Sequence, residues 1–167
     1  MQNDLPKRKS IRLPNYDYAQ AGNYFITICT QDGRHYFGEI VGATLCGRPN
    51  NPHVMIQSRL LELNNRFDDV VIPEYVVMPN HVHFIVRKTH KETPLSAIIG
   101  WYKTMTTNDY IKGVKNGLYE PFDKKLWQRN YYEHIIRNEE DYFKIAESIQ
   151  NNPKKWEMDC MNSLRHE

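Results

Sequence analysis

The stretch "YVVMPNHVHFIVRK", which runs from Tyr75 to Lys88, decides the fold of this chain. β-Branched and aromatic residues fill both of its halves, and Pro79-Asn80 stands between them as a turn signal. The pattern predicts two consecutive strands, Glu74–Met78 and His81–Lys88, joined by that turn. An antiparallel pair of strands is therefore expected at the centre of the chain.

Two histidines occupy the second of these strands. Side chains alternate between the two faces of a strand, so His81 and His83 share one face with Ile85 and Arg87. The apolar side chains of the other face, Val82, Phe84 and Val86, are expected to turn toward helices. Two imidazoles so placed can bind a metal ion if one or two further ligands complete the site. The same pair is also compatible with two half-buried histidines of an ordinary strand.

The elements on either side follow from hydrophobic periodicity and cap signals. Residues 23–30 predict a strand, and residues 32–52 carry turn signals and a short hairpin. Asn51-Pro52 and Thr93-Pro94 each predict a helix start, with a capping side chain followed by proline at the first helical position. The apolar residues that then recur at helical spacing are Ile56, Leu60, Leu63 and Phe67, and later Leu95, Ile98, Ile99, Tyr102 and Met105.

The last third of the chain predicts a loop over 113–125, a fourth strand over 126–136 and a third helix. Asn138 caps that helix and Pro153 ends it. The order of elements contains βαββαβ, which is the ferredoxin-like pattern. The expected fold class is α+β, an antiparallel sheet with helices on one face plus an extra C-terminal helix. We expect a single domain over 1–167, with a basic arm at 1–20 and a tail at 154–167.

Composition limits the class of protein. The chain has 167 residues, of which 40% are hydrophobic and 25% charged, as in ordinary globular domains. No apolar run approaches a membrane span and no secretory signal opens the chain, so we expect a cytoplasmic protein without a membrane partner. The three cysteines are far apart and form no CxxC pair, which argues against a disulfide framework or a cysteine-rich zinc site.

A nucleic-acid surface is indicated by where charge and aromatic residues gather, since the net charge is only +2. Lys7, Arg8, Lys9 and Arg12 lie together in "PKRKSIRLP" and could contact phosphates, although a solvated tail is the simpler explanation of these four residues alone. Tyrosines number 11 and tryptophans 3, and "WQRNYY" sets Trp127 beside Arg129. Stacking combined with charge is how single-stranded nucleic acid is bound, while core packing is the alternative for each aromatic residue.

The third helix carries two polar residues beside its apolar stripe. Tyr142, Ile145, Ala146 and Ile149 form the stripe. Ser148 and Asn152 lie on one flank at the i, i+4 spacing that brings side chains into contact. The amide oxygen of Asn152 suits a hard cation, and a role at the helix C-terminus is the alternative.

Three stretches together, "VVMPNHVHFIV", "WQRNYYEHIIRNEEDY" and "IQNNP", resemble the single-tyrosine HUH transposases, and most closely the REP-associated tyrosine transposase branch of the IS200-like superfamily. The resemblance runs from about Arg8 to Trp156. It implies a ferredoxin-like fold, single-stranded or hairpin DNA as partner, and a monomer or homodimer. It also implies Mg²⁺ or Mn²⁺ bound by His81, His83 and Asn152, and a tyrosine that attacks a DNA phosphodiester to form a phosphotyrosine.

The chain departs from that pattern at the nucleophile. Ser148 stands where the resemblance implies the tyrosine, and a serine hydroxyl is far less acidic than a phenol of pKa about 10. Alternative nucleophiles are Tyr131, Tyr132 and Tyr142, with Tyr142 better explained as core.

Two further residues, His134 and Arg137, could assist by touching phosphate. Three hypotheses remain open. They are a strand-transfer enzyme with another nucleophile, a DNA-binding relative that has lost cleavage, and, less favoured, a zinc-dependent hydrolase.

Overall fold

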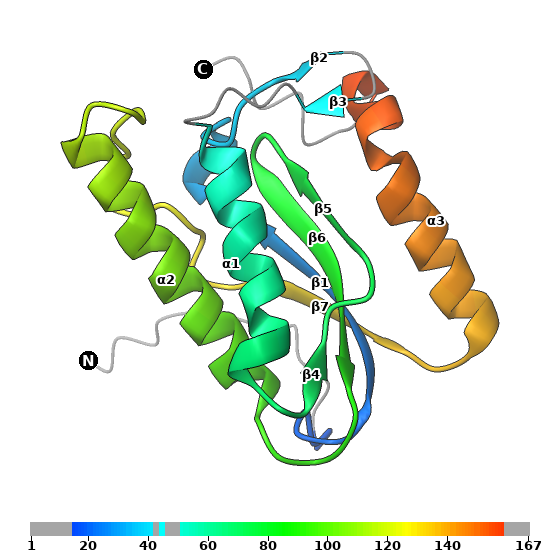
Figure 1. Ribbon diagram of the computed structural model, residues 1–167. Coiled ribbons are helices and arrows are strands. Elements are labelled where there is room, and N and C mark those ends of the chain that lie inside the picture. Colours follow the sequence, from blue (N-terminus) through cyan, green and yellow to red (C-terminus); the bar gives the residue numbers. More distant parts are fainter. Residues whose placement is uncertain (1–14, 42–43, 46–50, 159–167) are drawn as a thin grey trace, which may run out of the picture.

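The computed structural model describes residues 15–41, 44–45 and 51–158. The strands are β1 (Gly22–Cys29), β2 (Ile40–Val41), β3 (Thr44–Leu45), β4 (Val70–Val71), β5 (Tyr75–Met78), β6 (His81–Lys88) and β7 (Tyr132–Ile136). The α-helices are α1 (Pro52–Arg66), α2 (Leu95–Lys115) and α3 (Glu139–Lys155). Short 3-10 turns cover Gln31–Gly33 and Trp156–Met158. Figure 1 shows the chain as an α+β fold built around one antiparallel sheet.

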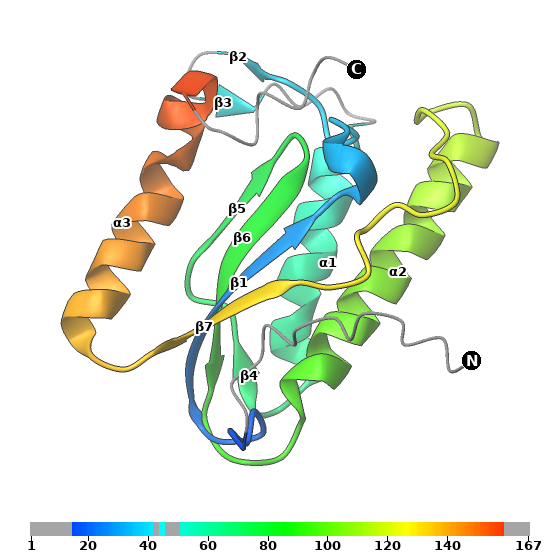
Figure 2. The same cartoon turned by 180° about the vertical axis from the view of Figure 1, so that it is seen from behind.

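The central sheet has five strands, in the order β4-β6-β1-β7, and β5 also pairs with β6. The predicted pair of strands on either side of Pro79-Asn80 is confirmed, because β5 and β6 pair antiparallel from Met78↔His81 outward. β1 lies between β6 and β7 and pairs antiparallel with both. Figure 2 shows β7 alongside β1, on the side away from β6. The predicted short hairpin is present as the pair β2-β3.

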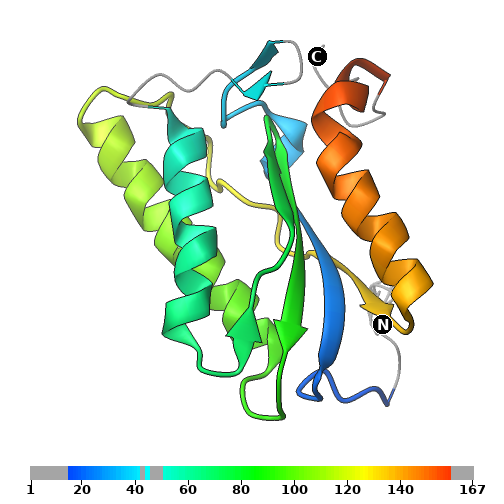
Figure 3. The same ribbon diagram turned by 45° about the vertical axis from the view of Figure 1, so that its right-hand side comes forward.

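The two faces of the sheet are covered by different helices. Figure 3 shows α1 and α2 on one face and α3 on the other. The larger core cluster lies under α1 and α2, and it includes the predicted inward residues Val82, Phe84 and Val86. A smaller cluster of Ile85, Ile136 and Ile149 lies under α3. The alternation predicted for β6 is therefore confirmed, and the face that carries the histidines is the face that α3 covers.

Two of the predicted helix caps are confirmed. The Asn51 side chain accepts a hydrogen bond from the backbone N–H of His53, and the Asn138 side chain accepts one from Asp141. The prediction that Thr93 caps α2 is wrong, because Pro94 is the N-cap residue. The N–H and hydroxyl of Thr93 donate instead to the buried carboxylate of Asp69.

Other boundaries also differ from those predicted, and one of them is the end of α2, which runs to Lys115 and so into the predicted loop over 113–125. Pro153 does not end α3, which continues to Lys155 because Trp156, only 3% exposed, anchors the following turn in the fold. The fourth strand is shorter than 126–136 and covers only Tyr132–Ile136. The carbonyl oxygens of residues 128–130 accept hydrogen bonds from Nζ of Lys103, which removes them from a strand ladder. Among the described helices, none is both long and apolar enough to cross a membrane.

Candidate metal and DNA site

His81 is fully buried at the start of β6 and is held in one orientation. Its Nδ1 lies 2.7 Å from Oδ1 of Asn80. The Asn80 amide nitrogen donates to the carbonyl of Gly33, so Oδ1 is the acceptor and His81 Nδ1 must carry the proton. Nε2 is then the atom with the lone pair, and it is buried without a hydrogen-bond partner among the described residues. A neutral imidazole with a free Nε2 lone pair is the form that binds a metal.

The electrostatic surroundings keep His81 neutral. Burial, together with smaller effects of the neighbouring imidazoles of His83 and His35, lowers its pKa to about 2. A histidine with so low a pKa does not compete for protons at neutral pH. It remains available as a ligand throughout the physiological range.

His83 lies beside His81 on the same face. The two ring centroids are 4.4 Å apart and the rings are steeply inclined to each other. Thr27 Oγ1 lies 2.8 Å from Nδ1 of His83, and the two residues are register partners on β1 and β6. The ring of Phe25 stacks on His83 at 5.4 Å. Both histidines are thus oriented by a polar side chain at Nδ1, as metal-binding histidines usually are.

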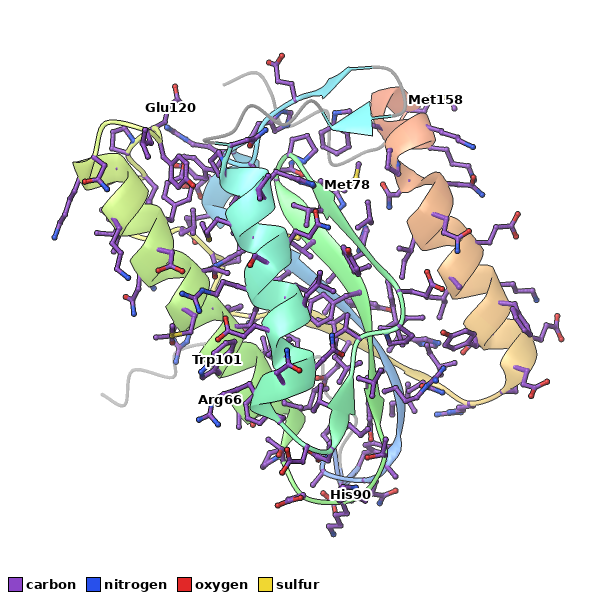
Figure 4. All side chains as sticks on the ribbon, viewed as in Figure 1. Arg66, Met78, His90, Trp101, Glu120 and Met158 are labelled. Carbon is purple, nitrogen blue, oxygen red and sulfur yellow. The ribbon has the colours of Figure 1, made fainter. Side chains whose placement is uncertain are left out.

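The C-terminal end of α3 approaches the histidine pair. The rings of Trp156 and His81 are 5.9 Å apart between centroids. Met78 is the register partner of His81 on the neighbouring strand. In Figure 4 the labelled Met78 lies at the end of the sheet nearest the labelled Met158, which follows α3. Asn152 is half-buried one helical turn before Trp156, and Ser148 is exposed one turn earlier still. Ser148 and Asn152, which the sequence placed on one flank of a helix, therefore lie on the helix that covers the histidines.

The donor set is two imidazoles and an amide. No group of three or more His, Cys, Asp or Glu side chains among the described residues could hold a metal ion. Within the described part of the chain, a third ligand for a cation would therefore be an oxygen outside those four types, and Asn152 is the candidate. Among the described residues, no cysteine or carboxylate joins the two histidines, and this donor set does not resemble a structural zinc site.

The candidate tyrosines occupy three different environments. Tyr131 packs against the core on the α1–α2 face, and Nζ of Lys103 lies 5.6 Å from the centre of its ring. Tyr142, on α3 itself, is half-buried against the smaller core cluster, and Nη2 of Arg87 is 3.4 Å from its hydroxyl. Tyr132 lies on the histidine face, and its side chain is exposed (50%). The structure separates Tyr131 from the histidines and leaves Tyr132 on their side of the sheet.

The residues proposed for DNA contact are likewise dispersed. Trp127 is 5% exposed and its Nε1 donates to Thr106, so the ring serves the core and is not presented for stacking. Arg129 and Arg137 are exposed. His134 lies on the α3 face, with Nε2 3.0 Å from Oδ2 of Asp141. Lys7, Arg8, Lys9 and Arg12 fall outside the described residues.

Sequence reasoning identified the histidines but missed the residues that orient them. Asn80 lies in the predicted turn, and its contact with His81 was predictable from the sequence. An amide side chain next to a histidine at the start of a strand can form a hydrogen bond with the imidazole. Thr27 and Trp156 gave no such signal, since strand register and the path of α3 decide their contacts.

Comparison with known proteins places the chain among transposases. Residues 50–152, more than half of the chain, match the IS200-like transposase family. An uncharacterized protein of Haemophilus influenzae is 37% identical over 168 residues, covering 91% of each chain. Another protein of the same organism, described as "Putative REP-associated tyrosine transposase", is 25% identical over 154 residues, which is 86% of this chain and 77% of the relative.

Two solved structures share the fold. A REP-associated tyrosine transposase bound to a REP hairpin superposes with a TM-score of 0.61 at 22% identity, over 87% of this chain and 73% of that chain. A "putative transposase" from Deinococcus radiodurans R1 superposes with a TM-score of 0.50 at 14% identity, over 84% of this chain and 95% of that chain. The chain belongs to the IS200-like transposase family and is related to the REP-associated tyrosine transposases.

Proposed function

We propose that this chain binds single-stranded or hairpin DNA at a site where His81, His83 and Asn152 hold Mg²⁺ or Mn²⁺, and that it carries out metal-assisted DNA strand cleavage and transfer. The observation that carries the proposal is Nε2 of His81. It is buried, has no partner among the described residues, and carries the lone pair because Asn80 fixes the proton on Nδ1. An unsatisfied buried nitrogen costs free energy unless a ligand uses it.

The chain's own residues would hold the ligands and shape the site. When bound, the cation would supply Lewis-acid polarisation of a phosphodiester oxygen. Asn80 keeps the Nδ1 side of the His81 imidazole engaged, which leaves its Nε2 for binding, and Thr27 orients the His83 imidazole through Nδ1. Trp156 closes the His81 side against solvent. Asn152 would complete the set with an amide oxygen, which Mg²⁺ and Mn²⁺ accept.

Support for a DNA partner comes from the relatives and from the distribution of charge. A structural relative was solved with a REP hairpin bound. In this chain Lys124, Lys125 and Arg129 line one open cavity of about 430 Å³ beside α2. A cluster of basic side chains suits a phosphate backbone.

We also infer that the fold is ferredoxin-like. Along the chain β1, α1, β5, β6, α2 and β7 follow a βαββαβ order, and in the sheet the strands lie in the order β7-β1-β6-β5.

The second candidate is a DNA-binding protein that no longer cleaves. It is favoured by one observation, namely that Ser148, at the position where a nucleophilic tyrosine is expected, is an exposed serine. In that case hairpin binding and metal binding would persist while no covalent intermediate forms. The two candidates share the same metal site and differ only in the attacking group.

The metal site is tested by hairpin binding with and without the cation. Fluorescence anisotropy would measure the affinity for a labelled DNA hairpin in Mn²⁺ and in EDTA. We expect Mn²⁺ to tighten binding for the unmodified chain but not for His81→Ala, and all affinities to fall as salt rises. His90→Ala is the matched control, since His90 is exposed at the opposite end of the sheet, where Figure 4 labels it. Equal Mn²⁺ responses in His81→Ala and the unmodified chain would refute the assignment.

A further inference from the structure

We propose that Tyr132 is the nucleophile of this chain and that His134 is its general base, with Asp141 positioning the histidine. The inference rests on the proposed function, because it names the attacking group for a phosphodiester bound at the histidine pair. It moves the attacking group from helix α3, where Ser148 stands, to strand β7 at the edge of the sheet.

Strand register places Tyr132 in the same row of paired residues as His83, across β7, β1 and β6. Thr27 of β1 is the register partner of His83 on one side and of Tyr132 on the other. Directly paired residues point to the same face, so His83, Thr27 and Tyr132 form one row across three strands. Two strand spacings separate the outer members by roughly 10 Å between Cα atoms. The phenol of Tyr132 and the histidine pair therefore lie on the same face of the sheet.

The aromatic contacts support the same placement. Phe25 stacks on His83 at 5.4 Å, and its ring meets that of Tyr132 at 6.5 Å edge to face. The ring of Tyr132 therefore contacts the same Phe25 ring that stacks on His83. Its hydroxyl makes no hydrogen bond with any residue in the described part of the chain, and half of the side chain is exposed.

A base lies next to Tyr132 on the same strand. His134 is two residues further along β7 and so points to the same face. Nε2 of His134 is 3.0 Å from the carboxylate of Asp141 on α3. This contact leaves Nδ1 as the atom that can accept a proton, in the nucleophile–base–carboxylate order used by activated hydroxyl nucleophiles. Tyr132, His134 and Asp141 all line one cavity of about 410 Å³.

The other hydroxyl groups are less suited. Tyr131 faces the α1–α2 side of the sheet. Tyr142 lies near Arg87, which bonds its hydroxyl and is four residues from His83, or about 13 Å along the strand. Ser148 lacks an acidic hydroxyl. Tyr132 alone combines an exposed phenol, a neighbouring base and a place in the row of His83.

The reaction is a transesterification that needs no oxidant or added co-reactant. The Oη–P bond of Tyr132 forms and the P–O3′ bond of the DNA breaks. The phenol proton passes to Nδ1 of His134 and returns through solvent to the leaving 3′-oxygen. The products are a phosphotyrosine and a free 3′-OH, and the reverse attack by a 3′-OH rejoins the strand.

The test is covalent capture of the attacking residue. The full chain would be incubated in Mn²⁺ with hairpin DNA that carries single-stranded flanks and a label at each end, and protein–DNA adducts separated under denaturing conditions. Tyr132→Phe should abolish the adduct and leave hairpin affinity unchanged, whereas Tyr131→Phe, the matched control, should form it normally. Fragment mass spectrometry should place the DNA on Tyr132.

His134→Gln tests the base separately. It should slow adduct formation by about 10²–10⁴-fold, and the defect should shrink as the pH rises, because hydroxide can then take the phenol proton in place of the missing base. The unmodified chain and His134→Gln share the other titratable groups around the cavity, which are Tyr18, Glu133, Arg137 and Asp141. A difference in pH dependence between the two proteins would therefore come from His134.

The outcomes separate the inference from the proposed function. Hairpin binding without any adduct would overturn the role of Tyr132 and leave the metal and DNA site standing. An adduct that persists in Tyr132→Phe, or that maps to Ser148 or Tyr142, would also overturn it. Failure of the unmodified chain to bind the hairpin in Mn²⁺ would remove the proposed function itself, and the inference with it.

Discussion

Protonation of His81 should make the metal-free protein sensitive to acid. Burial lowers the pKa of His81 to about 2 in the folded chain, against an ordinary value of about 6.5 when unfolded. Below pH 6.5 the unfolded chain therefore binds a proton that the folded chain does not. Stability from this group is fully present above pH 6.5 and falls as the pH is lowered.

The size of the effect follows from that difference in pKa. Each pH unit well below 6.5 removes about 1.4 kcal/mol from the free energy of unfolding. Between pH 8 and pH 5 the loss from His81 alone should be about 2 kcal/mol. This is a large part of the stability of a typical domain.

Urea unfolding in EDTA, followed by tryptophan fluorescence at pH 8 and pH 5, would measure the effect. His81→Gln should lose about 2 kcal/mol less than the unmodified chain over this interval, whatever its absolute stability. His53, whose pKa burial also lowers, titrates in both proteins and cancels. His90→Gln should behave like the unmodified chain. Equal pH dependence in His81→Gln and the unmodified chain would show that His81 is not held neutral by burial.

Two further substitutions test packing and orientation. Gly113→Ala should cost about 1–3 kcal/mol in urea unfolding, because its Cβ would collide with the ring of Tyr119. Gly100→Ala in the same helix meets no atom within 4 Å and should gain about 0.5–1 kcal/mol. Thr27→Val removes the hydroxyl that orients His83, and should weaken Mn²⁺-dependent hairpin binding about 10-fold by anisotropy with little change in melting temperature.

Much of the fold could be predicted from the sequence because local signals agreed with the final packing. The alternation along His81–Lys88 gave the two faces of β6 correctly, and Asn51 and Asn138 cap the helices they were expected to cap. The errors arose where a distant partner overrode a local rule. Thr93 bonds to Asp69 rather than capping α2, and Trp156 holds α3 together past its proline.

The candidate site divides in the same way. Spacing alone placed His81 and His83 on one face, since a strand has a fixed period. The state of His81 could not be predicted, because it depends on the contact between Asn80 and Gly33, residues 47 positions apart. The environment of Tyr132 also depends on long-range pairing, since only the register of β7 on β1 aligns it with Thr27.

The position of a nucleophile determines what the protein must move during strand transfer. A residue on α3 is carried by a helix whose buried contacts with the sheet are few, centred on Ala146, Ile149 and Trp156. A residue on β7 is fixed by hydrogen bonds to β1, and its base is tied to α3 through Asp141. With Tyr132 as the attacking group, cleavage and rejoining would take place against the rigid sheet, and α3 would only need to keep Asn152 and Asp141 in place. A chain with serine at position 148 could then still carry out strand transfer, because the strand register places Tyr132 in one row with His83 of the proposed metal site.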